Sequence, residues 1–147
     1  MRHCKRTAKL GMKSQHRRAT LANLVCSLIK HNRITTTVPR AKVARRWADR
    51  MITLAKKSEA TADPAKKVAY RRQAIAFLHV KPLVKKLFGD LGKQHADRKG
   101  GYTRIIRVGD RLGDAAEMAI LEWTGTAPVA AAPAPAPEKD AKPEEKK

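Results

Sequence analysis

The stretch RKGGYTRIIRVGDRLGDAAEMAILEW, residues 98–123, decides the fold class of this chain. Its runs GGYTRIIRV (100–108) and AAEMAILEW (115–123) are β-like, and GDRLGD (109–114) between them is typical of a hairpin turn. In the second run Ala119, Leu121 and Trp123 alternate with Met118, Ile120 and Glu122, so the two sets are expected on opposite faces of a strand. A β-hairpin is therefore predicted over these residues.

Two hairpin strands are only marginally stable alone, so a third strand is needed. The run RITTTV, residues 33–38, is β-branched. Its alternating sets are Ile34, Thr36 and Val38 against Arg33, Thr35 and Thr37. The predicted fold class is α+β, with four helices packed on a small three-stranded sheet.

Four helices are predicted from apolar spacing and from start and stop signals. They cover residues 14–31, 39–57, 64–79 and 82–91. Ser14 is the expected N-cap of the first helix, Asp63 that of the third, and Gly92 the expected stop of the fourth. First helical positions fall on Pro39, Pro64 and Pro82. The run SEATADPAKK (58–67) is expected to contain the linker before the third helix.

Two of these helices have clear apolar faces. The first consists of Leu21, Leu24, Val25, Leu28 and Ile29. The apolar face of the second helix (39–57) consists of Val43, Trp47, Met51 and Leu54, with the smaller Ala44, Ala48 and Ala55 beside them. At this spacing Trp47 is predicted to be a core residue in preference to a base-stacking one.

The two ends of the chain differ from its middle. Residues 1–13 have irregularly spaced basic residues and no apolar stripe, so they are predicted to be an extended basic arm. Residues 125–147, GTAPVAAAPAPAPEKDAKPEEKK, have one large apolar residue and are predicted to be a disordered tail. Residues 14–124 are then predicted to form a single α+β domain.

The net charge of +20 is the strongest functional signal. Thirteen Lys or Arg precede the first acid, Asp49, whereas four acids and four bases cancel in residues 125–147. A field this strong attracts polyanions. Nucleic acid is the first candidate partner, and an anionic membrane the second.

Other classes of protein fit the sequence poorly. It has no apolar run long enough to span a bilayer or to act as a signal peptide, and its basic character extends beyond a plausible transit peptide. We therefore expect no membrane partner and a cytoplasmic location. The residues His3, Cys4, His16 and Cys26 lack zinc-site spacing, so no metal or other cofactor is expected. No catalytic constellation is recognisable, which predicts no enzyme activity and no small-molecule substrate.

The choice between RNA and DNA stays open on composition alone. Six aromatic residues are too few for a single-strand reader, because most belong to predicted core stripes. A basic arm and basic helix faces suit contact with the backbone of a structured nucleic acid.

The 98–123 stretch closely resembles the C-terminal hairpin of the bacterial large-subunit ribosomal protein seventeen family, with its R-x-GGYTRI and GDAAPMA patterns. The resemblance covers residues 1–123. It continues in MRHCKRTAKLGMKSQHRRATLANLVCSLIKHNRITTTVPRAK (1–42), MITLAKK (51–57) and VKKLFGDLG (84–92). It implies a structural constituent of the large ribosomal subunit. Such a protein binds the large ribosomal RNA near the nascent-chain exit, beside neighbouring large-subunit ribosomal proteins.

The positions that match the family's motifs are the RNA contacts that the resemblance implies. They are Arg2, His3, Lys5, Arg6, Ser14, His16, Arg17, Arg18, Lys42, Arg46, Arg98, Tyr102, Thr103, Arg104 and Arg111. Tyr102 has two readings, stacking on RNA or packing locally, and local packing is favoured. Arg104 and Arg111 suit bidentate phosphate contact, with solvated surface charge as the alternative.

Three departures from the family pattern are expected to alter local structure. Glu117 replaces the usual proline, the 58–70 segment is longer than usual, and His79-Val80 replaces an acid before the fourth helix. None of them affects the basic arm. The competing functions are a nucleoid-type DNA-coating protein, an RNA-modifying enzyme or nuclease, and a membrane-surface binder.

Overall fold

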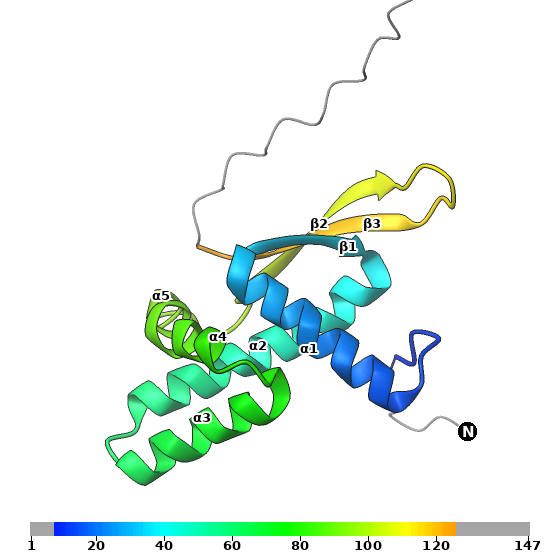
Figure 1. The fold of residues 1–147 in the computed structure, drawn as a ribbon. Helices are drawn as coiled ribbons and strands as arrows, with labels where there is room; N and C mark the ends of the chain where they lie inside the picture. Colours follow the sequence, from blue (N-terminus) through cyan, green and yellow to red (C-terminus); the bar gives the residue numbers. More distant parts are fainter. Residues whose placement is uncertain (1–7, 126–147) are drawn as a thin grey trace, which may run out of the picture.

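The protein is described here by a computed structural model, and the structure describes residues 8–125. The predicted contacts of Arg2, His3, Lys5 and Arg6 lie outside the described residues. The predicted disordered tail lies outside them as well, apart from Gly125. Figure 1 shows a helical half and a three-stranded sheet, with the hairpin extending beyond the helices.

The three strands predicted from the sequence form one antiparallel sheet, which confirms the α+β fold. They are β1 (Arg33–Thr37), β2 (Thr103–Asp110) and β3 (Glu117–Trp123). The strand order is β1-β3-β2, so the last strand lies at the centre. A register shift between Arg107 and Gly109 marks a bulge in β2. Such bulges increase the local twist.

The helices cover one face of the sheet, as the alternation in β3 requires. Ala119, Leu121 and Trp123 are fully buried. The Trp123 indole Nε1–H donates a hydrogen bond to the backbone carbonyl of Leu28, 3.1 Å away. This bond satisfies the polar atom of a large buried side chain and ties β3 to the first helix.

Helix α1 (Ser14–His31) has the predicted length but not the predicted cap. Its N-cap is Lys13, and no side chain donates or accepts a capping hydrogen bond there, so the expectation for Ser14 was wrong. At the other end Asn32 adopts a left-handed conformation, and its N–H donates to the carbonyl of Leu28. Asn tolerates this conformation better than most residues, which ends the helix just before β1.

Helix α2 (Val38–Ala60) runs through the middle of the domain, and its buried face differs from the prediction. Fully buried positions are Ala41, Ala44, Ala48, Ile52 and Ala55, with Met51 nearly so. Val43, Trp47 and Leu54 lie at the margin and are only partly buried. Because α2 contacts α1, α3 and the sheet, small residues occupy the closest approaches and large ones surround them.

The linker before α3 (Pro64–Leu78) is shorter than predicted. Helix α2 continues through the buried Ser58 to Ala60, which leaves three linking residues, 61–63. The predicted cap is confirmed, because the Asp63 side chain accepts a hydrogen bond of 2.9 Å from the N–H of Ala65. Most of the 58–70 segment is therefore helical, with residues 58–60 in α2 and residues 64–70 in α3.

The fourth helical stretch runs past the predicted stop. It consists of α4 (Lys81–Lys86), a π-helical turn (Leu87–Leu91) and α5 (Gly92–Gln94). Gly92 is buried, and a Cβ added there would lie 3.2 Å from the Cβ of Ala55. This glycine therefore serves the close approach of α5 to α2, and the expectation that it ends the helix was wrong.

Residues 8–13 turn instead of extending. The Met12 N–H donates to the carbonyl of Lys9, and both Leu10 and Gly11 have positive φ. Leu10 packs against the core. Residues 8–13 therefore lead into α1 through an anchored turn.

Candidate nucleic-acid interface

A basic groove lies between the N-terminal half of α1 and the middle of α2. Its volume is about 570 Å³. The residues that line it are Ala8, Arg17, Arg18, Leu21, Val43, Arg46, Trp47 and Arg50. The fold thus brings together three residues predicted from the sequence, Arg17, Arg18 and Arg46. We call this feature the arginine groove.

Helix geometry explains why the arginines gather here. Arg46 and Arg50 are four residues apart, so they lie on the same face of α2. Arg17 and Arg18 lie at the end of the first turn of α1 and the start of the second, and the first turn contains no acid. Cations at a helix N-terminus and like charges one turn apart both cost free energy. An anionic partner would relieve both penalties.

Trp47 lines the groove beside these arginines. Its ring stacks on Phe77 of α3, with 4.4 Å between ring centroids and an interplanar angle of 8°. The guanidinium carbon of Arg50 lies 5.8 Å from the Trp47 ring centroid. The core assignment made from spacing is therefore only partly right, because Trp47 is partly buried and also faces the groove. Arg50 was not among the predicted contacts, and its one signal in the sequence is its position four residues after Arg46.

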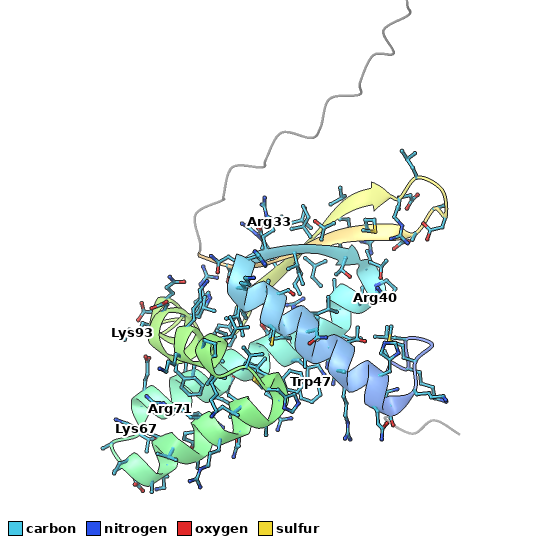
Figure 2. The ribbon with its side chains drawn as sticks, in the orientation of Figure 1. Arg33, Arg40, Trp47, Lys67, Arg71 and Lys93 are labelled. Atoms are coloured by element: carbon cyan, nitrogen blue, oxygen red, sulfur yellow. The ribbon has the colours of Figure 1, made fainter. Side chains whose placement is uncertain are left out.

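Other predicted contacts surround the groove. Lys42 is exposed one turn before Arg46 on α2, and Ser14 and His16 are exposed in the first turn of α1. Figure 2 shows Trp47 in the helical half, and Arg33 and Arg40 nearer the sheet. The basic side chains thus continue from the groove toward the sheet.

The outer face of the sheet carries a cluster of Arg33, Glu122 and Arg104, one residue from each strand. The Arg33 Nε–H donates to Glu122 Oε2 at 2.8 Å, and the Arg104 Nε–H donates to Glu122 Oε1 at 2.5 Å. Burial alone would raise the pKa of Glu122, but the hydrogen bonds and charges of both arginines hold that pKa below its usual value. Arg104, a predicted RNA contact, is positioned by this cluster and keeps about half of its side chain exposed.

Arg111 organises the hairpin tip. Its Nε–H donates to Asp114 Oδ1 at 3.0 Å, and its second guanidinium nitrogen donates to Asp114 Oδ2 at 2.6 Å. Hydrogen bonding from Arg111 lowers the pKa of Asp114 to about 2. The bidentate geometry predicted for a phosphate is thus used by a carboxylate within the turn.

Two predicted contacts have their side chains inside the domain. The Thr103 hydroxyl donates to Asp49 Oδ1 at 3.0 Å, and Tyr102 packs 5.7 Å from the His95 ring. Both Tyr102 and Thr103 are buried, so their side chains pack within the domain, which agrees with the local packing favoured for Tyr102. Burial raises the pKa of Asp49, although Thr103 and Arg45 act in the opposite direction.

Arg98 is exposed in the loop before β2. Its backbone carbonyl accepts a hydrogen bond from the Lys56 ammonium group of α2. This bond holds the loop against the helix. Arg98 therefore presents its side chain from a tethered segment.

Two properties of residues 8–125 bear on alternative functions. Among these residues no group of three or more His, Cys, Asp or Glu could hold a metal ion. No helix in the same part of the chain is long and apolar enough to cross a bilayer.

Comparison with known proteins adds a family assignment to this geometry. The family model described as Ribosomal protein L17 matches residues 20–124. Large ribosomal subunit protein bL17 of Fusobacterium nucleatum is 48% identical over 122 residues, covering 83% of this chain and 98% of the relative. The bL17 proteins of Desulforudis audaxviator and Rhodopseudomonas palustris are 50% and 46% identical, covering 78% and 84% of this chain and 95% and 85% of the relatives.

The match to the family model spans the α2 side of the arginine groove, the buried core and the hairpin, and it agrees with the motifs quoted from the sequence. By its sequence and its domain, this chain belongs to the ribosomal protein L17 family.

Proposed function

We propose that this chain is a structural constituent of the large ribosomal subunit that binds the large ribosomal RNA. The relatives bear the name of a large-subunit protein, and the body of the chain carries the whole net charge of +20. The single observation that carries RNA binding is the arginine groove, where four arginines surround one tryptophan. The resemblance found in the sequence also implies a location near the nascent-chain exit of a cytoplasmic ribosome, among neighbouring large-subunit proteins.

The groove is suited to the phosphate backbone of folded RNA. Guanidinium groups bind phosphate oxygens in a bidentate manner, and the exposed part of Trp47 offers an apolar surface for a ribose or base. Phosphate contacts of this kind position the protein without reading sequence. Other exposed predicted contacts extend this surface: Ser14 and His16 on α1, Lys42 on α2, Arg98 in the loop before β2 and Arg104 on β2.

The salt dependence of binding tests the groove quantitatively. If its four arginines each neutralise one phosphate, they contribute a slope of about −2.8 to −3.6 in log affinity against log salt. That slope corresponds to about a 50- to 150-fold loss of affinity between 50 and 200 mM salt. The variant R17Q/R18Q/R46Q/R50Q should lose this part of the slope. A matched control, K57Q/K66Q/R72Q/K99Q, removes the same charge from exposed positions outside the groove.

Sedimentation of cell lysates tests the assignment itself. The full chain should migrate with large subunits at moderate salt and remain there after a high-salt wash, and ribonuclease should release it. A chain that stays at the top of the gradient, or that follows nucleoid DNA and resists ribonuclease, refutes the proposal and supports the DNA-coating alternative. The thermal unfolding of each variant shows whether the domain is intact.

A further inference from the structure

A second cavity lies between α3 and the fourth helical stretch. None of the RNA contacts predicted from the sequence lines it. Its volume is about 560 Å³, and it is formed by α2, α3, α4, the π-helical turn and α5. It shares no lining residue with the arginine groove. Its volume falls within the range of about 300–1,000 Å³ that is typical of small-ligand sites.

Five cations surround this cavity. Lys67 and Arg71 come from α3, and Lys81, Lys85 and Lys93 come from the fourth helical stretch. Figure 2 shows Lys67 and Arg71 along α3 and Lys93 on α5, on the same end of the helical half. Glu59 is the one acid among the lining residues.

The rim charges are not neutralised within the domain. Over residues 8–125, none of these five side chains forms an ion pair within 4.0 Å. Like charges gathered around one cavity repel one another. The cavity therefore favours an anionic occupant.

The interior of the cavity is apolar. Ile75, Val84 and Phe88 line it, and the last two are almost completely buried in the core. Phe88 belongs to the π-helical turn, a rare geometry that is frequent at functional sites. Gly89 also lines the cavity, and a Cβ added there would meet no atom within 4 Å. The absence of a side chain at this position keeps the cavity open.

We propose that this cavity receives one unstacked nucleotide of the ribosomal RNA, with its base on the apolar interior and the adjoining phosphates on the cationic rim. The inference rests on the proposed function and names a second point of contact. A bare anion would not require the apolar interior, and an apolar side chain would not require five cations. An unstacked nucleotide combines a flat base with an anionic backbone, and proteins commonly recognise folded RNA through such bases.

Two variants of different kinds test the cavity. G89L fills it from a position with room for a side chain, and leucine has the higher helix propensity. K67Q/R71Q/K93Q removes three rim charges and leaves the apolar interior intact. The control K57Q/R72Q/K99Q removes three charges from exposed positions that do not line the cavity.

The measurement is chemical probing of base edges in large subunits that carry each full-length chain. One nucleotide, or two adjacent ones, should be protected with the wild-type chain and gain reactivity severalfold with G89L and with the rim variant, but not with the control. For the purified chain and large-subunit RNA, filling the cavity should weaken binding by about 5- to 150-fold, the range expected for one stacked base.

The outcomes separate this inference from the proposed function. If the wild-type chain binds the RNA and no base changes reactivity in either cavity variant, the inference is wrong and the proposed function stands. A protein segment resolved inside the cavity, in a structure of large subunits that carry the wild-type chain, also overturns it, because a peptide would then occupy the place of the nucleotide. If the wild-type chain fails to bind the RNA, both fail. Should G89L unfold, the rim variant decides the matter alone.

Discussion

Removing the Glu122 carboxylate should destabilise the domain, because this one buried acid holds two arginines on the outer face of the sheet. Glu122 lies on the central strand, and its side chain is only 7% exposed. Hydrogen bonds to charged groups contribute about 1.5–3 kcal/mol each, so the two from Arg33 and Arg104 would contribute at least about 3 kcal/mol if fully buried.

Solvent reduces this value. The Arg33 side chain is 30% exposed and that of Arg104 is 56% exposed, so water partly replaces the lost acceptor in each case. We therefore expect E122A to lower the free energy of unfolding by about 2 kcal/mol, and E122Q by about half as much because the amide still accepts a hydrogen bond. For a domain of this size, 2 kcal/mol corresponds to a fall in Tm of about 8 °C.

Thermal and urea unfolding of the full chain measure this effect. R107A, on the exposed part of β2, is the matched control and should change stability by less than about 0.5 kcal/mol. The cluster lowers the pKa of Glu122, so its contribution should be complete above the unfolded value of about 4.5 and be lost as the pH falls below it. A Tm within 2 °C of wild type for E122A at pH 7 would refute this reasoning.

Three further predictions concern the core and the helix ends. His95 is buried, and within residues 8–125 neither of its ring nitrogens has a hydrogen-bond partner. Burial, followed by the charges of Arg98 and Lys56, lowers its pKa below the ordinary 6.5. The free energy of unfolding should therefore decrease as the pH falls below about 6.5, and H95F should remove that part of the pH dependence. D63A removes the cap of α3 and should cost about 1 kcal/mol in urea unfolding, whereas the exposed D97A should cost little. G92V should lower Tm markedly because its side chain meets α2, and an unchanged Tm would contradict the close approach seen here.

The elements of this fold were readable from local sequence because their signals act over a few residues. The β-branched run at 33–38 and the glycine-rich turn at 109–114 predicted the sheet, since both constrain backbone dihedral angles directly. The Asp63-Pro64 pair marked the start of α3 for the same reason. The first apolar face was also predicted correctly, because α1 buries one continuous stripe.

The errors arose where a distant element decides the outcome. Gly92 has the sequence signal of a helix stop, but it is buried because α2 lies against it. The large residues of α2 were expected at its centre, yet alanines occupy the positions closest to its neighbours. In both cases the packing distance between helices overrides local propensity. That distance depends on residues far apart in the sequence, so a short stretch of sequence does not predict it.

The basic surface was also predictable only in part. The sequence by itself determined that this chain has a strongly basic body and a small α+β domain, because charge and backbone propensity are properties of the residues themselves. Only the tertiary structure decided which cations share a surface. It joined Arg17 and Arg18 to Arg50 across two helices, buried Thr103, and gathered lysines around a second cavity. Such groupings depend on how helices cross, which is set by the packing of side chains that lie far apart in the sequence.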